Sequence, residues 1–291
     1  MSVKTTPNGL ICALTAFLIW GIFPLYFKEL SDYPASEVIV HRIIWTFVVL
    51  LFVMIVGRRT QWLAMMRQHP RWLAFAFLAS LLIASNWLIY VWAVAHNQIL
   101  EASLGYFINP LFGVLLSVIL FGERLRTFQK IAVALATAAI LIQILWLGGL
   151  SWISLLLPLS FGIYGVIQRQ TPFNAIDGLF LETLLLVPLC LGWLVTTDVK
   201  SSHLDFWFSY DIWLLTLAGP ITLIPLLLYN QATRWIAFNT LSFLNYLTPS
   251  IVFLLAIFYY HEGFDIKKLL VFSLIWLGLI IYSIDLIKHK S

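Results

Sequence analysis

The chain has 291 residues, of which 62% are hydrophobic and 10% charged, and its mean hydropathy is +0.95. A soluble globular protein needs more polar surface than this, so the composition predicts a membrane protein. The net charge of +4 comes from Lys and Arg residues spread over short connections, which indicates contact with lipid headgroups and argues against a nucleic-acid partner.

Ten apolar stretches are long enough to cross a hydrocarbon core of about 30 Å as helices. The first is too long for a signal peptide and no cleavage site follows it, so we count it as a span. In chain order the stretches cover residues 10–27, 36–57, 71–95, 101–121, 128–147, 151–168, 175–197, 211–233, 238–260 and 266–287. Five precede Gly148 and Gly149 and five follow. We therefore expect an all-α polytopic membrane protein of two five-helix units, residues 1–148 and 149–291.

A sparse repeat relates the two halves. Seven positions between residues 90 and 123 carry the same residue as the position 139 further along, among them Tyr90 and Tyr229, Pro110 and Pro249, and Glu123 and Glu262. Because each half has an odd number of spans, the second copy is expected to be inverted, which is an architecture of secondary transporters.

The connections between the spans differ in their content of Lys and Arg. With the N-terminus inside, 12 of these residues lie in inner connections and 4 in outer ones, while Arg42 lies within a span. The positive-inside rule then places both termini in the cytoplasm.

Charged residues lie inside the second span, at His41 and Arg42, and inside the seventh, at Glu182. Charges at such depth are costly and normally face a partner or a water-filled path. One hypothesis is a relay for protons or substrate charge. The alternative is structural, with these groups locking helices together or reaching toward the membrane surface.

Amide and aromatic side chains occur in the first, third, sixth and eighth spans. We predict that they line a cavity for a neutral or zwitterionic organic substrate. The alternative is that they form ordinary hydrogen bonds between helices. The set comprises Trp20, Asn86, Tyr90, Tyr164, Tyr229 and Asn230.

Pro110 and Pro249 lie inside the fourth and ninth spans, where each frees a carbonyl four residues earlier, at Tyr106 and Asn245. Interrupted helices at matching positions point to a transporter binding site, so we predict hinges there. Simple kinks satisfied by neighbouring helices are the alternative. The polar residues expected to join the cavity are Tyr106, Asn109, Asn245 and Tyr246, with Thr248 beside Pro249.

Glu123 and Glu262 end the fourth and ninth spans. A carboxylate at a helix C-terminus opposes the helix dipole, so these residues are not explained by the stability of their own helices. We consider them possible gates, Glu123 pairing with Arg169 or Arg67 and Glu262 with Lys28. The alternative is a solvated loop glutamate that contributes little.

Small residues mark places of close helix approach. Gly113 and Ser117 form one small-xxx-small pair, and alternating alanines from Ala132 to Ala138 smooth the fifth span. The sequence does not say whether the partner helix is in the same chain.

The run from Glu101 to Leu111, Glu-Ala-Ser-Leu-Gly-Tyr-Phe-Ile-Asn-Pro-Leu, with Gly122 and Glu123 after it, resembles the EamA family of the drug/metabolite transporter (DMT) superfamily. His41-Arg42, Asn86-Trp87 and the segment 20–24 resemble its RarD branch. The likeness spans nearly the whole chain and is looser in the second half. It implies ten helices in two inverted repeats, a bacterial inner membrane, and export of small metabolites such as amino acids, or of drugs such as chloramphenicol.

Other classes of function have less support in the sequence. The chain has no His-Glu-x-x-His, Gly-x-Ser-x-Gly or P-loop motif, so we do not expect an enzyme. Cys12 and Cys190 are too few for a metal cluster, and no cofactor is expected. A channel would show a charge ring or a filter loop. A non-transporting scaffold or an intramembrane enzyme remains the alternative to a monomeric transporter of a small molecule.

Overall fold

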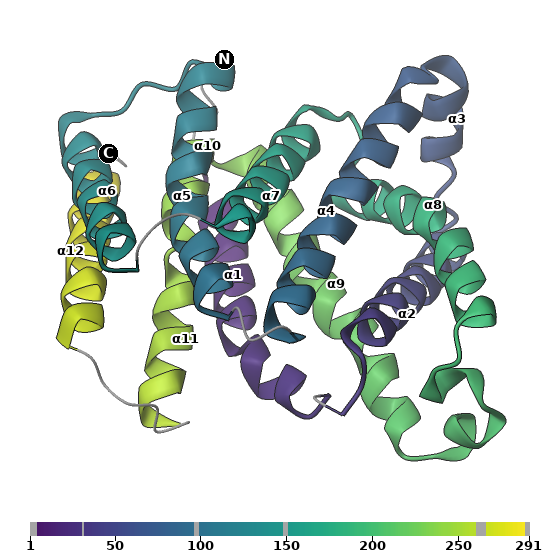
Figure 1. Cartoon of the computed structure of the whole chain (residues 1–291). Coiled ribbons are helices and arrows are strands. Elements are labelled where there is room, and N and C mark those ends of the chain that lie inside the picture. The colour runs from purple at the N-terminus through teal and green to yellow at the C-terminus, as the bar shows by residue number, and fades with distance from the viewer. Residues whose placement is uncertain (1–4, 31, 96–98, 148–150, 260–265, 289–291) are drawn as a thin grey trace.

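The computed structural model describes residues 5–30, 32–95, 99–147, 151–259 and 266–288, and within these ranges it contains helices and no strand (Figure 1). In the first half the helices are α1 (Pro7–Lys28), α2 (Ala35–Val56), α3 (Gln61–Gln68), α4 (Arg71–Ala95), α5 (Ile99–Phe121) and α6 (Thr127–Leu147). In the second half they are α7 (Trp152–Gln170), α8 (Ala175–Thr196), α9 (Asp211–Trp235), α10 (Phe238–Leu244), α11 (Leu247–Phe258) and α12 (Ile266–Lys288). Two short 3-10 helices, η1 (Lys200–Ser202) and η2 (Leu204–Phe208), join α8 to α9.

Each of the ten predicted stretches coincides with a helix, except that the ninth is divided into α10 and α11. The short helix α3 lies in a connection that the sequence analysis counted as polar loop. Among the described residues, five helical segments are long and apolar enough to cross a membrane: Pro7–Phe27, Ala35–Val56, Arg71–Tyr90, Ala175–Thr196 and Ile212–Trp235. Three shorter apolar segments, Ile108–Phe121, Thr127–Ile142 and Ser273–Asp285, belong to α5, α6 and α12.

The two halves run in opposite directions. The Thr6 amide, before α1, donates to the Trp235 carbonyl at the end of α9 at 3.1 Å. Arg234 Nη2 donates to the Gln168 carbonyl, in the last turn of α7, at 3.0 Å. Helix α1 therefore begins at the end of the bundle where its counterpart α7 finishes, and the second half is inverted relative to the first.

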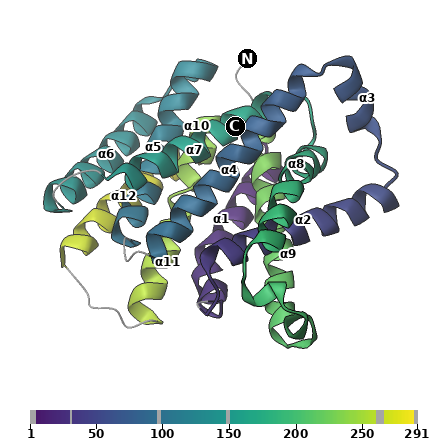
Figure 2. The same cartoon turned by 45° about the vertical axis from the view of Figure 1, so that its right-hand side comes forward.

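Helices of the two halves also pack on one another in matching pairs. Helix α1 packs on α9 and α11, while its counterpart α7 packs on α4 and α5. Helices α2 and α8, α5 and α10, and α6 and α12 pack as pairs of counterparts. Figure 2 shows α6 and α12 together at one edge, away from α2, α8 and α9. The halves are thus interleaved around a pseudo-twofold axis; the proposed division at 148 and 149 lies outside the described residues.

Glycines permit the closest helix contacts. A Cβ at Gly219 in α9 would lie 2.6 Å from the backbone nitrogen of Thr46 in α2, so these two helices touch backbone to backbone. A Cβ at Gly113 in α5 would lie 2.8 Å from Ser242 Cβ in α10. The predicted small pair at Gly113 therefore packs on a helix of the same chain.

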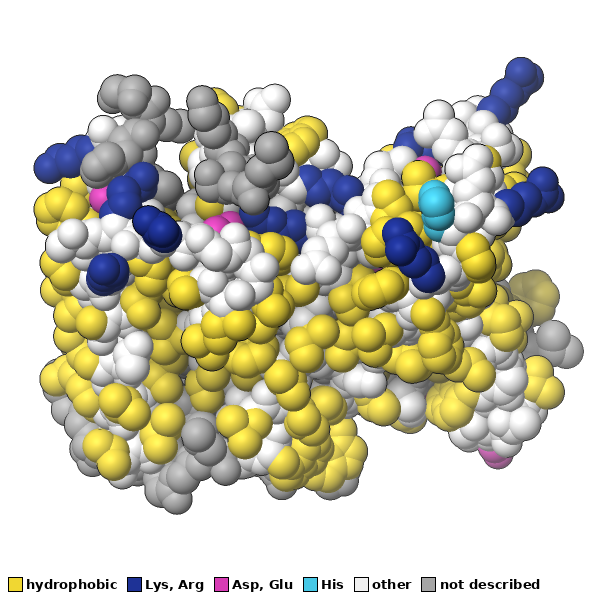
Figure 3. Space-filling model, turned by 90° about the horizontal axis from the view of Figure 1, so that it is seen from above, with side chains coloured by type: hydrophobic (Ala, Val, Ile, Leu, Met, Phe, Trp, Pro, Cys, Tyr) yellow, Lys and Arg dark blue, Asp and Glu magenta, His cyan; other side chains and the backbone are white. Residues whose placement is uncertain are grey.

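Large apolar side chains cover much of the outside, as expected where the solvent is lipid. Val195 is 87% exposed, Leu145 79% and Phe52 67%. Basic side chains lie apart from the apolar surface. Figure 3 views the bundle from above and shows Lys and Arg side chains in the upper part of the picture, next to a broad hydrophobic band. Arg126 pairs with Asp285 at 2.6 Å between Nε and Oδ2, near the end of α12.

Candidate functional site

A small central cavity lies where α1, α5, α7, α9 and α10 meet. Three predicted residues, Asn109, Tyr229 and Asn245, line it together with Phe17, Phe161 and Ser242. Its space for water, about 10 Å³, is about what a single buried water needs. This conformation is therefore closed to an organic molecule, although residues with amide and hydroxyl groups are among those that line the cavity.

An aromatic group forms one side of this cavity. The Tyr229 ring lies 5.0 Å from the Phe161 ring and 5.6 Å from the Trp20 ring, measured between centroids. Phe17 completes the group at 6.2 Å from Tyr229. Rings at such distances pack as a rigid apolar wall, so Trp20 supports the cavity from behind Tyr229.

The ninth span breaks beside the cavity. Helix α10 ends at Leu244 and α11 begins at Leu247, which leaves Asn245 and Tyr246 between them. Pro249 is the third residue of α11, where its missing N–H costs no helical hydrogen bond. Helix α5, by contrast, continues through Pro110. The two prolines thus occupy different local structures, and only the second lies next to an interruption.

Thr248 joins α11 to α1 by donating to the Phe17 carbonyl at 3.0 Å.

Four predicted cavity residues lie in contacts between helices. Asn86 Nδ2 donates to the Leu157 carbonyl at 2.9 Å and to Ser160 Oγ at 3.0 Å, which joins α4 to α7. Asn230 Nδ2 donates to the Tyr164 hydroxyl at 2.9 Å, which joins α9 to α7.

Tyr246 is fully buried in the cluster between α10, α6 and α12, with its ring 5.6 Å from Phe243. The hydrogen bonds of Asn86, Tyr164 and Asn230 match the packing alternative, whereas the Tyr246 hydroxyl is buried without a described partner.

Arg42 is buried in α2 with aromatic neighbours. Its Nε donates to Thr222 Oγ1 of α9 at 2.9 Å. Its guanidinium carbon lies 4.3 Å from the Trp87 ring centroid and 5.1 Å from that of Phe27. The sequence analysis singled out Arg42 but missed Thr222, because a lone threonine in an apolar span has no distinctive pattern.

The neighbouring His41 and the distant Glu182 have separate surroundings. His41 Nδ1 accepts from Trp45 Nε1 at 3.2 Å, and the imidazole packs 5.9 Å from the Phe206 ring. Glu182 accepts a hydrogen bond from Gln168, a residue the sequence analysis did not single out. Arg42 and Glu182 each stand seven residues after the first residue of their helix, Ala35 or Ala175. They are counterparts in the repeat but have no contact with each other in the described structure.

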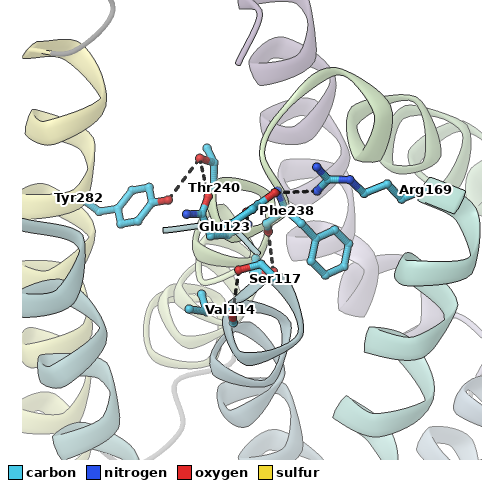
Figure 4. Close-up of polar contacts among 9 residues, drawn as sticks. Val114, Ser117, Glu123, Arg169, Phe238, Thr240 and Tyr282 are labelled. Atoms are coloured by element: carbon cyan, nitrogen blue, oxygen red, sulfur yellow. Dashed lines mark hydrogen bonds and ion pairs between the residues drawn. The ribbon is translucent and has the colours of Figure 1, made fainter. Parts of the chain in front are cut away.

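Glu123 lies at the centre of a buried polar cluster where α5, α7 and α10 meet (Figure 4). Arg169 Nη1 donates to Glu123 Oε1 at 2.9 Å, and the two side chains are 8% and 4% exposed. The Phe238 amide donates to Oε1 at 2.8 Å and the Asn239 amide to Oε2 at 2.9 Å. The carboxylate thus caps the N-terminus of α10 and pairs with Arg169, so it is not a solvated loop residue.

The surroundings of this ion pair hold it in place. The Arg169 guanidinium lies 4.2 Å from the Phe121 ring centroid, and Gly122 has φ +62, a left-handed conformation that favours glycine at the end of α5. On the far side of the cluster, Thr240 shares a hydrogen bond of 3.2 Å with the Tyr282 hydroxyl. Of the two partners predicted for Glu123, the structure selects Arg169. Glu262 lies outside the described residues.

Comparison with known proteins gives a match to the model of the EamA-like transporter family in both halves, over residues 7–145 and 147–284. Uncharacterized transporter PA0485 of Pseudomonas aeruginosa is 44% identical over 98% of this chain and 96% of its own. Protein RarD of Escherichia coli is 38% identical over 99% and 97%. Chloramphenicol-sensitive protein RarD of Pseudomonas aeruginosa is 29% identical over 97% and 96%.

The fold is also found among solved structures. One crystal structure superposes with a TM-score of 0.70, covers 99% of both chains and is 19% identical in sequence. At this identity the comparison supports the fold and carries no information on substrate.

Proposed function

Because the chain belongs to the EamA-like transporter family, we propose that this multi-pass membrane protein exports small metabolites, amino acids and related compounds first among them, by alternating access. The observation that carries the proposal is the position of Glu123. It joins the counterpart helices α5 and α10 by accepting from the amide of Phe238, a residue that lines the cavity. The relative at 44% identity is named a transporter, and so is the matching family, which supports transport as the activity.

Opening of this end would require a discrete set of contacts to break. Arg169 must leave Glu123, and the first turn of α10 must lose its cap. Because α10 is only seven residues long and ends at an interruption beside Asn245, it can move as a unit without bending α11. Such a short, interrupted helix at the substrate site is a common feature of secondary transporters.

The orientation follows from charge. Arg126, Arg169 and Arg234 all lie at the same end of the bundle as Thr6 and Glu123. By the positive-inside rule we assign this end, with both termini, to the cytoplasm of a bacterial inner membrane. The Glu123 cluster is then the cytoplasmic gate, and the conformation described is closed on the cytoplasmic side.

The choice of candidate substrates rests on the cavity and on the relatives. Amides at Asn109 and Asn245 and a ring at Tyr229 suit a compact molecule with polar and apolar parts. One relative at 29% identity is named for chloramphenicol sensitivity, and this neutral amphiphile belongs in the first screen. A single copy is proposed to be sufficient, since the cavity is built from one chain.

The test is transport by purified protein in liposomes. Radiolabelled amino acids and chloramphenicol are offered in counterflow and under an imposed pH gradient, with empty liposomes and a Glu123→Gln variant alongside. Saturable exchange of at least one compound by the wild type is expected, and dependence on the gradient distinguishes proton coupling from facilitated diffusion. Folded protein that exchanges none of them would favour the scaffold alternative.

A further inference from the structure

Arg42 is a buried cation without a counter-charge. The residue is 5% exposed, and no carboxylate of the described part of the chain pairs with it. Thr222 occupies Nε, while the two terminal nitrogens make no hydrogen bond to any described residue. A cation within a membrane span is costly unless a partner or water compensates it.

Aromatic rings surround the guanidinium without neutralising it. Trp87 and Phe27 lie at 4.3 and 5.1 Å, distances at which cation–π attraction offsets only part of the cost of burial. Such a setting excludes water from the sides of the guanidinium and leaves its outer edge as the place for an anion. That edge carries parallel N–H groups, which match the two oxygens of a carboxylate.

Two phenols lie in the neighbourhood of Arg42. They are Tyr90 of α4 and Tyr106 of α5, whose rings are 5.5 Å apart. Both side chains are only partly buried, and neither hydroxyl makes a hydrogen bond within the described ranges. Tyr26 is different, because its hydroxyl already donates to the Leu214 carbonyl. Tyr90 and Tyr106 are therefore donors available to a ligand.

The counterpart position carries a group of the opposite charge type. Glu182 stands at the equivalent depth of α8, accepts a hydrogen bond from Gln168 at one carboxylate oxygen, and has no described partner at the other. Neither Arg42 nor Glu182 has a partner of opposite charge in the described structure, so one half presents an unpaired cation and the other an unpaired carboxyl group.

We propose that Arg42, with the hydroxyls of Tyr90 and Tyr106, binds the carboxylate of the transported molecule. This inference rests on the proposed transport function and adds a contact point for the substrate outside the cavity, since Arg42 is not among the residues that line it. Substrates are organic monoanions or zwitterions whose apolar part lies against Trp87 and Phe27. A single arginine balances a single negative charge, so a phosphate dianion is disfavoured.

The test compares probes that differ only in the carboxylate. Phenylacetate and L-phenylalanine are measured against phenylacetamide and L-phenylalaninamide, by binding to detergent-solubilised protein and by counterflow in liposomes. Wild type is expected to prefer each carboxylate over its amide by about tenfold or more. Arg42→Gln is expected to abolish this preference, and Tyr90→Phe and Tyr106→Phe to reduce it severalfold. Tyr210→Phe, at an exposed tyrosine, is the matched control.

The outcomes separate this inference from the proposed function. Wild type that transports other compounds but shows no preference for carboxylates would overturn the role of Arg42 and leave transport intact. An Arg42→Gln protein that prefers carboxylates over amides as strongly as wild type does would also overturn the role of Arg42. Should Arg42→Gln fail to fold, Arg42→Lys keeps the charge and loses the planar fork, and it is expected to fold and bind each carboxylate more weakly. Occupation by an anionic lipid headgroup would appear as stabilisation by phosphatidylglycerol with no effect of phenylacetate, and would also refute the proposal.

Discussion

The Glu123 carboxylate, two residues beyond the end of α5, accepts a hydrogen bond of 2.8 Å from the amide of Phe238, the first residue of α10. The end of the fourth span thus holds the start of the ninth, its counterpart in the repeat. Because Arg169 shares the same carboxylate oxygen, three helices depend on one side chain at this end of the bundle.

Glu123→Gln is expected to destabilise the protein by about 3–5 kcal/mol, since removal of one partner leaves the other buried charge, on Arg169, uncompensated. The measurement is thermal or denaturant unfolding in detergent. Asp198→Asn is the control, because it breaks the exposed pair with His203 and is expected to have little effect. A Glu123→Gln protein as stable as wild type would show that the ion pair is not a structural lock.

The double variant Glu123→Gln with Arg169→Gln is expected to recover a substantial part of that loss. The glutamine oxygen still accepts from the Phe238 amide, and no unpaired charge remains. Exchanging the charges, with arginine at 123 and glutamate at 169, is expected to fail, because arginine has no acceptor for the α10 amides. A double-mutant cycle by unfolding checks both, and full rescue by the charge exchange would contradict the capping role.

Gly219→Ala is expected to lower stability by about 1–3 kcal/mol or to prevent folding, because the added methyl meets the backbone of α2 and cannot be relieved by a side-chain rotation. Gly192→Ala is the matched control, since nothing lies within 4 Å of a Cβ there, and its higher helix propensity predicts no loss. Yield of monodisperse protein and unfolding temperature are the readouts. Equal behaviour of the two variants would argue against close packing of α2 on α9.

Asn86→Ala and Asn245→Ala are expected to act on different properties. Asn86 joins α4 to α7 through two hydrogen bonds, so its loss is expected to cost about 1–3 kcal/mol of stability without changing which substrates compete. Asn245 lines the cavity, so its replacement is expected to change substrate affinity with a smaller effect on stability. Competition assays and unfolding on both variants check this. A changed substrate affinity in Asn86→Ala with a loss of stability in Asn245→Ala would contradict the assignment.

Pro249→Ala is expected to slow transport severalfold while leaving stability unchanged or increased. Alanine restores an N–H that the Asn245 carbonyl can accept, which favours joining α10 to α11 across the interruption. Pro110→Ala is expected to have a smaller effect, because α5 is already continuous through that position. Counterflow rates for both variants provide the measurement, and equal losses would indicate that both prolines act as hinges.

Much of the architecture was predictable because it depends on local properties. Apolar length determines where helices cross a membrane, and an odd number of spans in each half makes a duplicated half inverted. The division of the ninth span between Leu244 and Leu247 was not predicted. Asn245 and Tyr246 keep helical backbone angles, so neither residue type marks the interruption, and the nearest sequence signal is Pro249, three positions after Tyr246.

The candidate site was only partly predictable. Asn109, Tyr229 and Asn245 line one small cavity, and their role in binding a substrate stays a prediction. Tyr246, on the same short stretch as Asn245, faces α6 and α12. Adjacent residues on a helix point in directions about 100° apart, so shared polarity does not imply a shared surface.

The sequence by itself determined the membrane environment, the helical class, the duplication and the identity of the buried charges, because these follow from composition, length and spacing along one chain. Only the tertiary structure decided which partner each charge has: Glu123 has Arg169 and the α10 amides, Glu182 has Gln168, and Arg42 has Thr222 without a described carboxylate. Such pairings join residues from separate helices, and the packing of whole helices selects among them.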